Sequence, residues 1–339
     1  MQLVDLVPDL APVILAARQA RDARNTLEQF LPTVNVLSVS YRLGRTQRLD
    51  QTVPVRAIDA PATPIRRPGV VDVKGDLPAI TPIVNLSEQD LTNDMVLARQ
   101  LAGLDVDFTP AVESGAALAA VTVDNTLELM RAQLLSTGVV SLVADDGLTH
   151  AVDFGVPDAQ KFVPQTAWNA EGADPFGDLV RWHRAFIAAS GGPAGAILGS
   201  DDVYARLLAV MKAQFPQQPI GQAALSAHMT DLRLPQFVTY DRTMRDASGS
   251  VTRLYPDDSL SFLPAQDAPV GRTELGITQE AVQQVLRGTL QADQAPGLTI
   301  VTLGQDDPVQ RAVKAAALGM PVLRDVDSIV IASAIFGPR

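Results

Sequence analysis

The chain has 339 residues, of which 47% are hydrophobic and 19% charged, and its formal net charge is −11. This composition indicates a globular protein, and the length predicts one large domain or two to three lobes. The negative charge argues against DNA or RNA as a directly bound ligand. The absence of cysteine excludes disulfides, cysteine nucleophiles and cysteine-based zinc sites.

Residues 1–33 are predicted to form one amphipathic helix that ends at Pro32, an arm that needs a partner surface to stay folded. No signal-peptide pattern is present, because Asp5 and Asp9 come before the first basic residue, Arg18. The longest apolar runs are far shorter than the ~20 residues that cross a bilayer. We therefore expect a soluble protein that is made inside the cell and has no membrane contact.

Residues 34–84 contain six prolines and no helical periodicity. Short β-type runs occur at 34–41, 51–59, 70–73 and 80–85, with little apolar material for a separate core. About fifty residues without a helix predict a long excursion, either an extended β-hairpin or a loop, that lies on some other surface.

Charge divides this excursion from the segment that follows it. Residues 34–84 have seven basic residues against four acidic ones, whereas residues 85–130 have eight acidic residues against Arg99 alone. A nucleic-acid arm and a solvated loop both fit this pattern, but complementary surfaces that meet between copies of the chain fit it better. The basic set is Arg42, Arg45, Arg48, Arg56, Arg66, Arg67 and Lys74. The acidic set is Glu88, Asp90, Asp94, Asp105, Asp107, Glu113, Asp124 and Glu128.

The rest of the chain mixes helices and strands. The longest predicted helix spans 110–136, with Thr109 as its cap and Gly138 as its end. A two-stranded ribbon, 139–144 and 149–154, follows it. Further helices are predicted at 174–189, 200–213, 278–287 and 307–319, and strands at 194–198, 236–241, 250–254, 259–263 and 298–303. The apolar run 327–336 predicts a buried central strand.

No catalytic or metal-binding signature emerges from these elements. The glycine-rich stretch 191–195 follows a helix and opens a strand, the reverse of a phosphate loop. The four Asp-Asp pairs, which begin at 145, 201, 257 and 306, fit turns and helix starts better than a metal site.

The histidines and tryptophans also show no catalytic or ligand-binding pattern. His150, His183 and His228 are predicted in a strand, a helix and a loop, and they form no motif. Trp168 and Trp182 fit core or interface anchors better than a ligand platform. We expect no catalytic, cofactor-binding or metal-binding residue, and we favour a structural, self-associating protein.

Five stretches in a fixed order carry a resemblance to a known family. They are THAVDFG (149–155), TAW followed by ADPFGDL (166–179), AILGSDDVYARLL (196–208), YPDDSLSFLP (255–264) and LGITQEA (275–281). In this order the chain resembles the lambda-like major capsid protein E family of tailed bacteriophages, which has the Johnson-type capsid fold.

The resemblance implies an α+β fold with four parts. These are an N-terminal arm (1–33), an extended β-hairpin called the E-loop (34–84), a peripheral domain with a long spine helix (85–165 and 297–339) and an axial domain (166–296). It implies a major capsid protein, not an enzyme, that self-assembles into hexamers and pentamers of the icosahedral head shell around phage double-stranded DNA. The E-loop would reach over a neighbouring subunit, so that the basic set meets the acidic set between copies.

The resemblance also implies partners and a location. The protein would be part of the virion head, assembled in the host cytoplasm, and would enclose DNA without binding a specific sequence. A separate scaffold, protease and portal are expected partners, and shell stability would rest on non-covalent contacts or on a decoration protein. The arm helix begins by about residue 9, too early for an attached scaffold segment. Lys74 has no assignable Asn partner, so no covalent cross-link is expected. The alternatives are an encapsulin-like compartment shell of the same fold and a cytosolic α/β enzyme with a remote polar triad.

Overall fold

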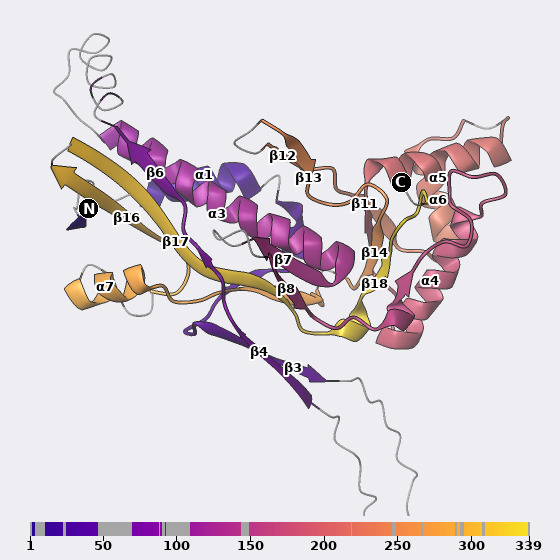
Figure 1. The fold of residues 1–339 in the computed structure, drawn as a ribbon. Coiled ribbons are helices and arrows are strands. Elements are labelled where there is room, and N and C mark those ends of the chain that lie inside the picture. The colour runs from indigo at the N-terminus through magenta and orange to yellow at the C-terminus, as the bar shows by residue number, and fades with distance from the viewer. Residues whose placement is uncertain are drawn as a thin grey trace, which may run out of the picture. The chain divides into compact units, whose positions relative to one another are not determined.

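The computed structural model describes most of the chain and divides it into two compact units (Figure 1). Unit 1 comprises residues 1–41, 75–132 and 272–322, and unit 2 comprises residues 42–74, 133–271 and 323–339. The described residues are 2–3, 11–22, 25–46, 70–87, 89, 92, 109–143, 149–217, 219–245, 249–265, 267–288, 290–291, 295–306 and 309–337.

Unit 1 is built on a mixed sheet of seven described strands. Along its main path the order is β1 (Gln2–Leu3), β16 (Thr299–Asp306), β17 (Val309–Leu323), β15 (Gly271–Leu275) and β2 (Thr33–Asn35). Two short strands, β5 (Ala79–Ile80) and β6 (Ile83–Leu86), also pair with β17. The long strand β17 is therefore the element that holds this sheet together.

The helix predicted at 307–319 is wrong, because this segment forms most of β17. Its run of alanines has a high helix propensity, which explains the error. In the fold the segment pairs with β16 over eight residues and also with β5 and β6, and Ala315, Ala316 and Ala317 are fully buried. Pairing and burial in the sheet therefore override the local preference.

Two helices cover opposite faces of β17 (Figure 1). The predicted long helix is confirmed as α3 (Thr109–Thr137), about 40 Å long at the α-helical rise per residue. Gly115 of α3 lies so close to the strand that a Cβ there would be 3.3 Å from Val313 Cγ2. The next residue of β17, Lys314, faces the other side and donates to Glu280 of α7 (Gln279–Arg287) at 2.6 Å.

The N-terminal segment differs from the single helix predicted for residues 1–33. It contains α1 (Ala11–Asp22) and a short 3₁₀ turn, η1 (Thr26–Gln29), before β2. The excursion that follows includes β3 (Ser40–Thr46) and β4 (Val70–Asp76), which form a two-stranded sheet and agree with a hairpin. The predicted β-run 51–59 lies outside the described residues.

Unit 2 is built on a sheet of five described strands with three helices. The strand order is β11 (Gln236–Thr239), β10 (Ala196–Gly199), β14 (Leu260–Leu263), β18 (Val330–Ala332) and β9 (Lys161–Phe162). The helices are α4 (Pro175–Ser190), α5 (Asp201–Gln214) and α6 (Gln222–Asp231). Two ribbons, β7 (Val139–Val143) with β8 (Thr149–Asp153) and β12 (Thr243–Arg245) with β13 (Val251–Arg253), and two 3₁₀ turns, η2 (Asp158–Gln160) and η4 (Val326–Ser328), complete it.

Several helix ends follow the sequence signals. The side chains of Asp174, Ser200 and Thr278 cap α4, α5 and α7 by accepting hydrogen bonds from backbone N–H groups three residues on. Gly191 ends α4 with φ 75°, a left-handed conformation that glycine adopts readily. The stretch 191–195 is thus the helix-to-strand turn that was predicted. Helix α6 and strands β12 and β15 are not predicted from the sequence, and the loop predicted at His228 is wrong, because this residue lies in α6.

The two compact units do not coincide with the domains predicted from the sequence. β18, placed with the peripheral segment, pairs with β14 of unit 2. Residues 272–287, placed with the axial segment, belong to unit 1, where β15 pairs with β2. A strand belongs to the sheet that completes its hydrogen bonds, and a linear reading of the chain does not contain this information.

The core of unit 2 is centred on the two tryptophans. Trp168 and Trp182 are fully buried, and their rings stack with centroids 5.8 Å apart and an interplanar angle of 11°. Trp168 Nε1 donates to Asp178 Oδ2 at 3.0 Å. Their role as core anchors is confirmed.

His183 lies in the same core as a neutral side chain. It is 6% exposed, its ring stacks on that of Phe262, and its Nε2 accepts a hydrogen bond from Ala194 N at 3.2 Å. Because Nε2 is an acceptor, the ring must be uncharged in this arrangement. Burial lowers the pKa of His183.

Acid should therefore destabilise unit 2 through His183. The unfolded chain takes up this proton first, so the stability contributed by neutral His183 is lost as the pH falls below about 6.5. We expect His183→Gln, which keeps an acceptor but cannot ionise, to lose less melting temperature than the wild type between about pH 7 and about pH 5. Both tryptophans lie in unit 2, so their fluorescence measures its unfolding. Equal losses in the two proteins would contradict this account.

Candidate assembly surfaces

A buried ion pair lies at the centre of unit 1. Glu128 and Arg131 are three residues apart on α3, so they share a helix face, and they are 0% and 3% exposed. Arg131 Nη1 donates to Glu128 Oε2 at 3.0 Å. The other carboxylate oxygen, Oε1, accepts from the backbone N–H of Leu27 at 3.2 Å. A buried pair is tolerated only when its remaining polar atoms are satisfied, as they are here.

Arg131 extends this network to two further segments. Its Nε donates to Thr273 Oγ1 of β15 at 2.9 Å, and its Nη2 donates to Thr33 Oγ1 of β2 at 2.6 Å. Thr33 in turn donates to Glu28, and Thr273 donates to the carbonyl of Leu31 at 3.0 Å. One guanidinium therefore joins the N-terminal segment, α3 and β15.

A second ion pair holds the N-terminal helix to α3. Arg18 of α1 donates through Nε and Nη2 to the two carboxylate oxygens of Asp124, each at 2.9 Å. Asp124 is 7% exposed. A paired, two-point contact of this kind fixes orientation as well as distance. The partner surface that the arm was expected to need is thus supplied, in this structure, by the chain's own α3.

These contacts bear on whether the acidic set can bind a neighbouring copy. Asp124 and Glu128 have partners inside the chain and are buried, so neither is available to a neighbouring copy in this conformation. Their sequence spacing on α3 gave no indication of this. Glu113 is half-buried on the same helix. The other five members, Glu88, Asp90, Asp94, Asp105 and Asp107, lie outside the described residues.

The described members of the basic set lie on the β3–β4 hairpin. Arg42 and Arg45 belong to β3, and Lys74 is an exposed residue of β4. Arg48, Arg56, Arg66 and Arg67 lie outside the described residues. The pairing of the basic and acidic sets between copies therefore stays a prediction.

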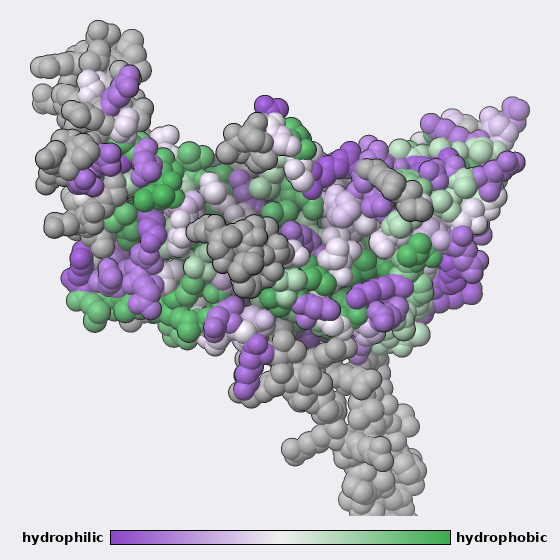
Figure 2. All heavy atoms as spheres, in the orientation of Figure 1, coloured by the Kyte–Doolittle hydropathy of each residue, from purple (hydrophilic) through white to green (hydrophobic). Residues whose placement is uncertain are grey.

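Large apolar side chains are exposed on both units, and Figure 2 shows apolar residues distributed among polar ones on one face. Leu37 and Val39, in the segment that leads into β3, are 75% and 50% exposed, and Leu286 of α7 is 81% exposed. Single exposed apolar residues are ordinary.

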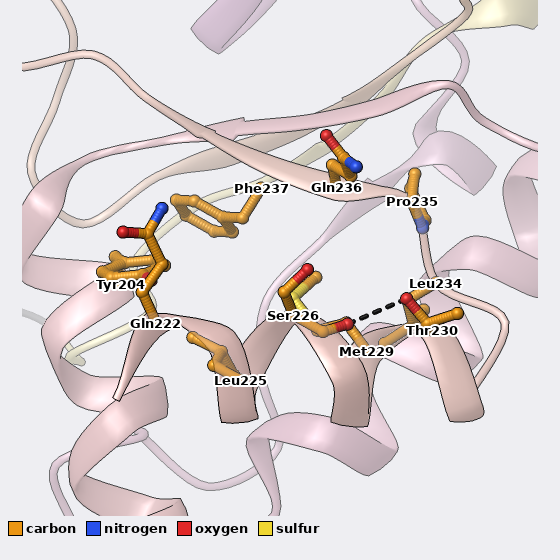
Figure 3. Close-up of a pocket in the computed structure, with 10 residues that line it drawn as sticks. All are labelled: Tyr204, Gln222, Leu225, Ser226, Met229, Thr230, Leu234, Pro235, Gln236 and Phe237. Atoms are coloured by element: carbon orange, nitrogen blue, oxygen red, sulfur yellow. Dashed lines mark hydrogen bonds between the residues drawn. The ribbon is translucent and has the colours of Figure 1, made fainter. Parts of the chain in front are cut away.

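Among the described residues, no group of three or more His, Asp or Glu side chains could hold a metal ion. His183 is committed to the core, the ring of His228 meets Phe176 edge-on at 4.8 Å, and His150 lies in β8. A cavity of about 290 Å³ lies between α5, α6 and β11, and its lining contains no charged residue (Figure 3).

Solved structures share this fold across nearly the whole chain. The putative capsid protein of a prophage of E. coli CFT073 is 11% identical with a TM-score of 0.60, covering 98% of this chain and 99% of that one. A phage-related protein from Bordetella bronchiseptica RB50 is 12% identical with a TM-score of 0.60 over 100% of both chains. The capsid of the Myoviridae phage XM1 is 12% identical with a TM-score of 0.50 over 91% of both. The fold is thus the α+β fold of phage capsid proteins.

Residues 27–334 match the family model for the phage major capsid protein E. The chain belongs to the phage major capsid protein E family, which confirms the resemblance carried by its five motifs. It is a shell-forming structural protein of the phage head. In the described part of the chain, no helix is both long and apolar enough to cross a membrane.

The buried Glu128–Arg131 pair is expected to hold the N-terminal segment in place. Glu128→Gln leaves the buried Arg131 cation without its carboxylate, which should cost about 3–5 kcal/mol. The backbone amides of residues 25–35 should then exchange hydrogen markedly faster, as measured by mass spectrometry.

Glu280→Gln is the matched control. It makes the same substitution in the partly exposed pair with Lys314, where a cost of about 1 kcal/mol or less is expected. Exchange at residues 25–35 should be unchanged in this variant. Equal exchange in the two variants would show that the buried network does not hold the N-terminal segment.

Proposed function

We propose that the protein assembles into hexamers and pentamers that close the icosahedral head shell around phage double-stranded DNA. The match of residues 27–334 to the phage major capsid protein E family carries this proposal. The same match favours a phage shell over an encapsulin-like compartment. Hexamers and pentamers are rings of identical subunits, and head-to-tail contacts between unlike surfaces close such rings.

The hairpin that contains β3 and β4 supplies one half of such a contact. Its basic set meets acidic residues of the neighbouring copy's α3 region. Because Asp124 and Glu128 are occupied within their own chain, the acceptors are the remaining members, of which Glu113 is described. Each exposed ion pair contributes about 1 kcal/mol or less, so stability comes from many copies acting together. Weak single contacts also let misplaced subunits dissociate during assembly.

The proposed role is structural and not enzymatic, which membership of a capsid protein family supports. Scaffold, protease, portal and decoration functions belong to separate proteins. The enclosed DNA is not bound in a sequence-specific way, which fits the net charge of −11.

Reversing the charge of the hairpin tests the inter-subunit contact. The double variant Arg45→Glu, Arg48→Glu should lose most of its shell yield, measured by sedimentation and electron microscopy, because attraction becomes repulsion. The isolated subunit should keep its wild-type tryptophan fluorescence.

A double variant with the same charge change elsewhere provides the control. Arg184 and Arg324 are exposed residues of unit 2 that belong neither to the basic set nor to the lining of the cavity beside β11. Arg184→Glu, Arg324→Glu should assemble like the wild type. Unchanged shell yield in the hairpin variant would refute the proposed contact.

A further inference from the structure

The sheet of unit 2 has an open edge at β11. This strand is the last of the sheet and pairs only with β10 among the described strands. Thr239 lies opposite Gly199, and Tyr240 N donates to Gly199 O at 2.9 Å. In a parallel ladder this places the backbone N–H and C=O groups of Thr239, and of Phe237 two residues earlier, on the outer side. An edge of this kind is a template for another extended strand.

A groove runs beside this edge, between β11 and α6 (Figure 3). Its floor is apolar and buried, formed by Leu225, Met229 and Leu234. Its rim is polar, uncharged and exposed, formed by Gln222, Ser226, Thr230 and Gln236. The volume of about 290 Å³ suits a small number of neutral side chains from one extended segment.

The β12–β13 ribbon of the same unit has the properties expected of a segment that would occupy the groove. The ribbon of β12 and β13 pairs only with itself in the described structure, so its outer edges are open as well. Val251 of β13 is 55% exposed. An exposed apolar side chain on an open strand matches an apolar groove beside an open strand.

One charge of the ribbon has partners within its own chain. Arg253 Nη1 lies 2.8 Å from Asp202 Oδ2 and 3.4 Å from Asp241 Oδ1. The uncharged groove therefore does not have to accommodate this guanidinium. The ribbon also carries Arg245, which is exposed and pairs with Val251, so this one guanidinium must stay at the polar rim. The β3–β4 hairpin fits the groove less well, because it carries five charged residues: Arg42, Arg45, Asp72, Lys74 and Asp76.

We propose that the groove and the outer edge of β11 receive the β12–β13 ribbon of a second copy of this chain, which adds a strand to the sheet. The groove and the ribbon are unlike surfaces, so the contact is head-to-tail and can close a ring. The inference rests on the proposed function, because it assigns one contact of the proposed hexamers and pentamers. It is separate from the contact made by the basic hairpin.

Cross-linking of single-cysteine variants tests the contact directly, since the natural chain has no cysteine. Ser226→Cys places a thiol on the groove rim, and Val251→Cys places one on the ribbon. Purified proteins of the two kinds, distinguished by mass, are mixed, assembled and treated with a short bismaleimide. We expect a strong mixed dimer band that contains one chain of each kind.

Ala227→Cys is the matched control, because Ala227 is an exposed residue of α6 that does not line the groove. Its mixture with Val251→Cys should give little cross-linking. Equal cross-linking from positions 226 and 227, or none from either, in samples that contain shells would overturn the groove contact and leave the proposed function standing. Samples without shells and without the 226–251 cross-link would overturn both.

A backbone variant separates the strand edge from the groove. Thr239→Pro removes the outward N–H of β11 and leaves the hydrogen bonds to β10 intact, as natural edge-strand prolines do. We expect it to lose most of its shell yield and its ring cross-link, whereas Thr239→Val, which keeps the N–H, should retain both. Full assembly of Thr239→Pro would overturn the strand-addition part of the proposal.

Discussion

The Glu128–Arg131 pair is the constraint on which unit 1 depends. Removing two charges from water is costly, and the cost is offset only when every remaining donor and acceptor is bonded. Here the bonding partners are Leu27, Thr33 and Thr273, which come from segments far apart in the sequence. The N-terminal segment and β15 must therefore lie against α3 for the pair to be stable. This buried network defines one arrangement of the three segments.

The same helix also takes part in the proposed contact between copies. Its face toward β17 carries small residues that allow close packing, and its buried charges hold the N-terminal segment, including Arg18 of α1 through Asp124. The acidity of α3 therefore has an internal use as well as the inter-subunit use that charge alone predicts. A shell protein benefits from this division, because the strong contacts keep the subunit rigid while weak, exposed contacts join the copies reversibly.

Sequence reasoning succeeded where local chemistry determines structure. The caps Asp174, Ser200 and Thr278, the end of α4 at Gly191 and the long helix α3 all follow from neighbouring residues. It failed where the fold overrides local preference, as in the alanine-rich β17, and where partners are distant, as for Asp124 and Glu128. The family was predicted from the order of five sequence motifs. The groove beside β11 could not be predicted from the sequence. Helix α6 was not predicted, and the position of β11 at the edge of the sheet is defined only in the folded chain.

Electron microscopy of the purified protein, with and without a co-expressed scaffold, tests the central claim most directly. The account predicts hollow closed shells, with projections that show rings of five and six subunits. A protein that remains a small, uniform species under both conditions, and under macromolecular crowding, would contradict it.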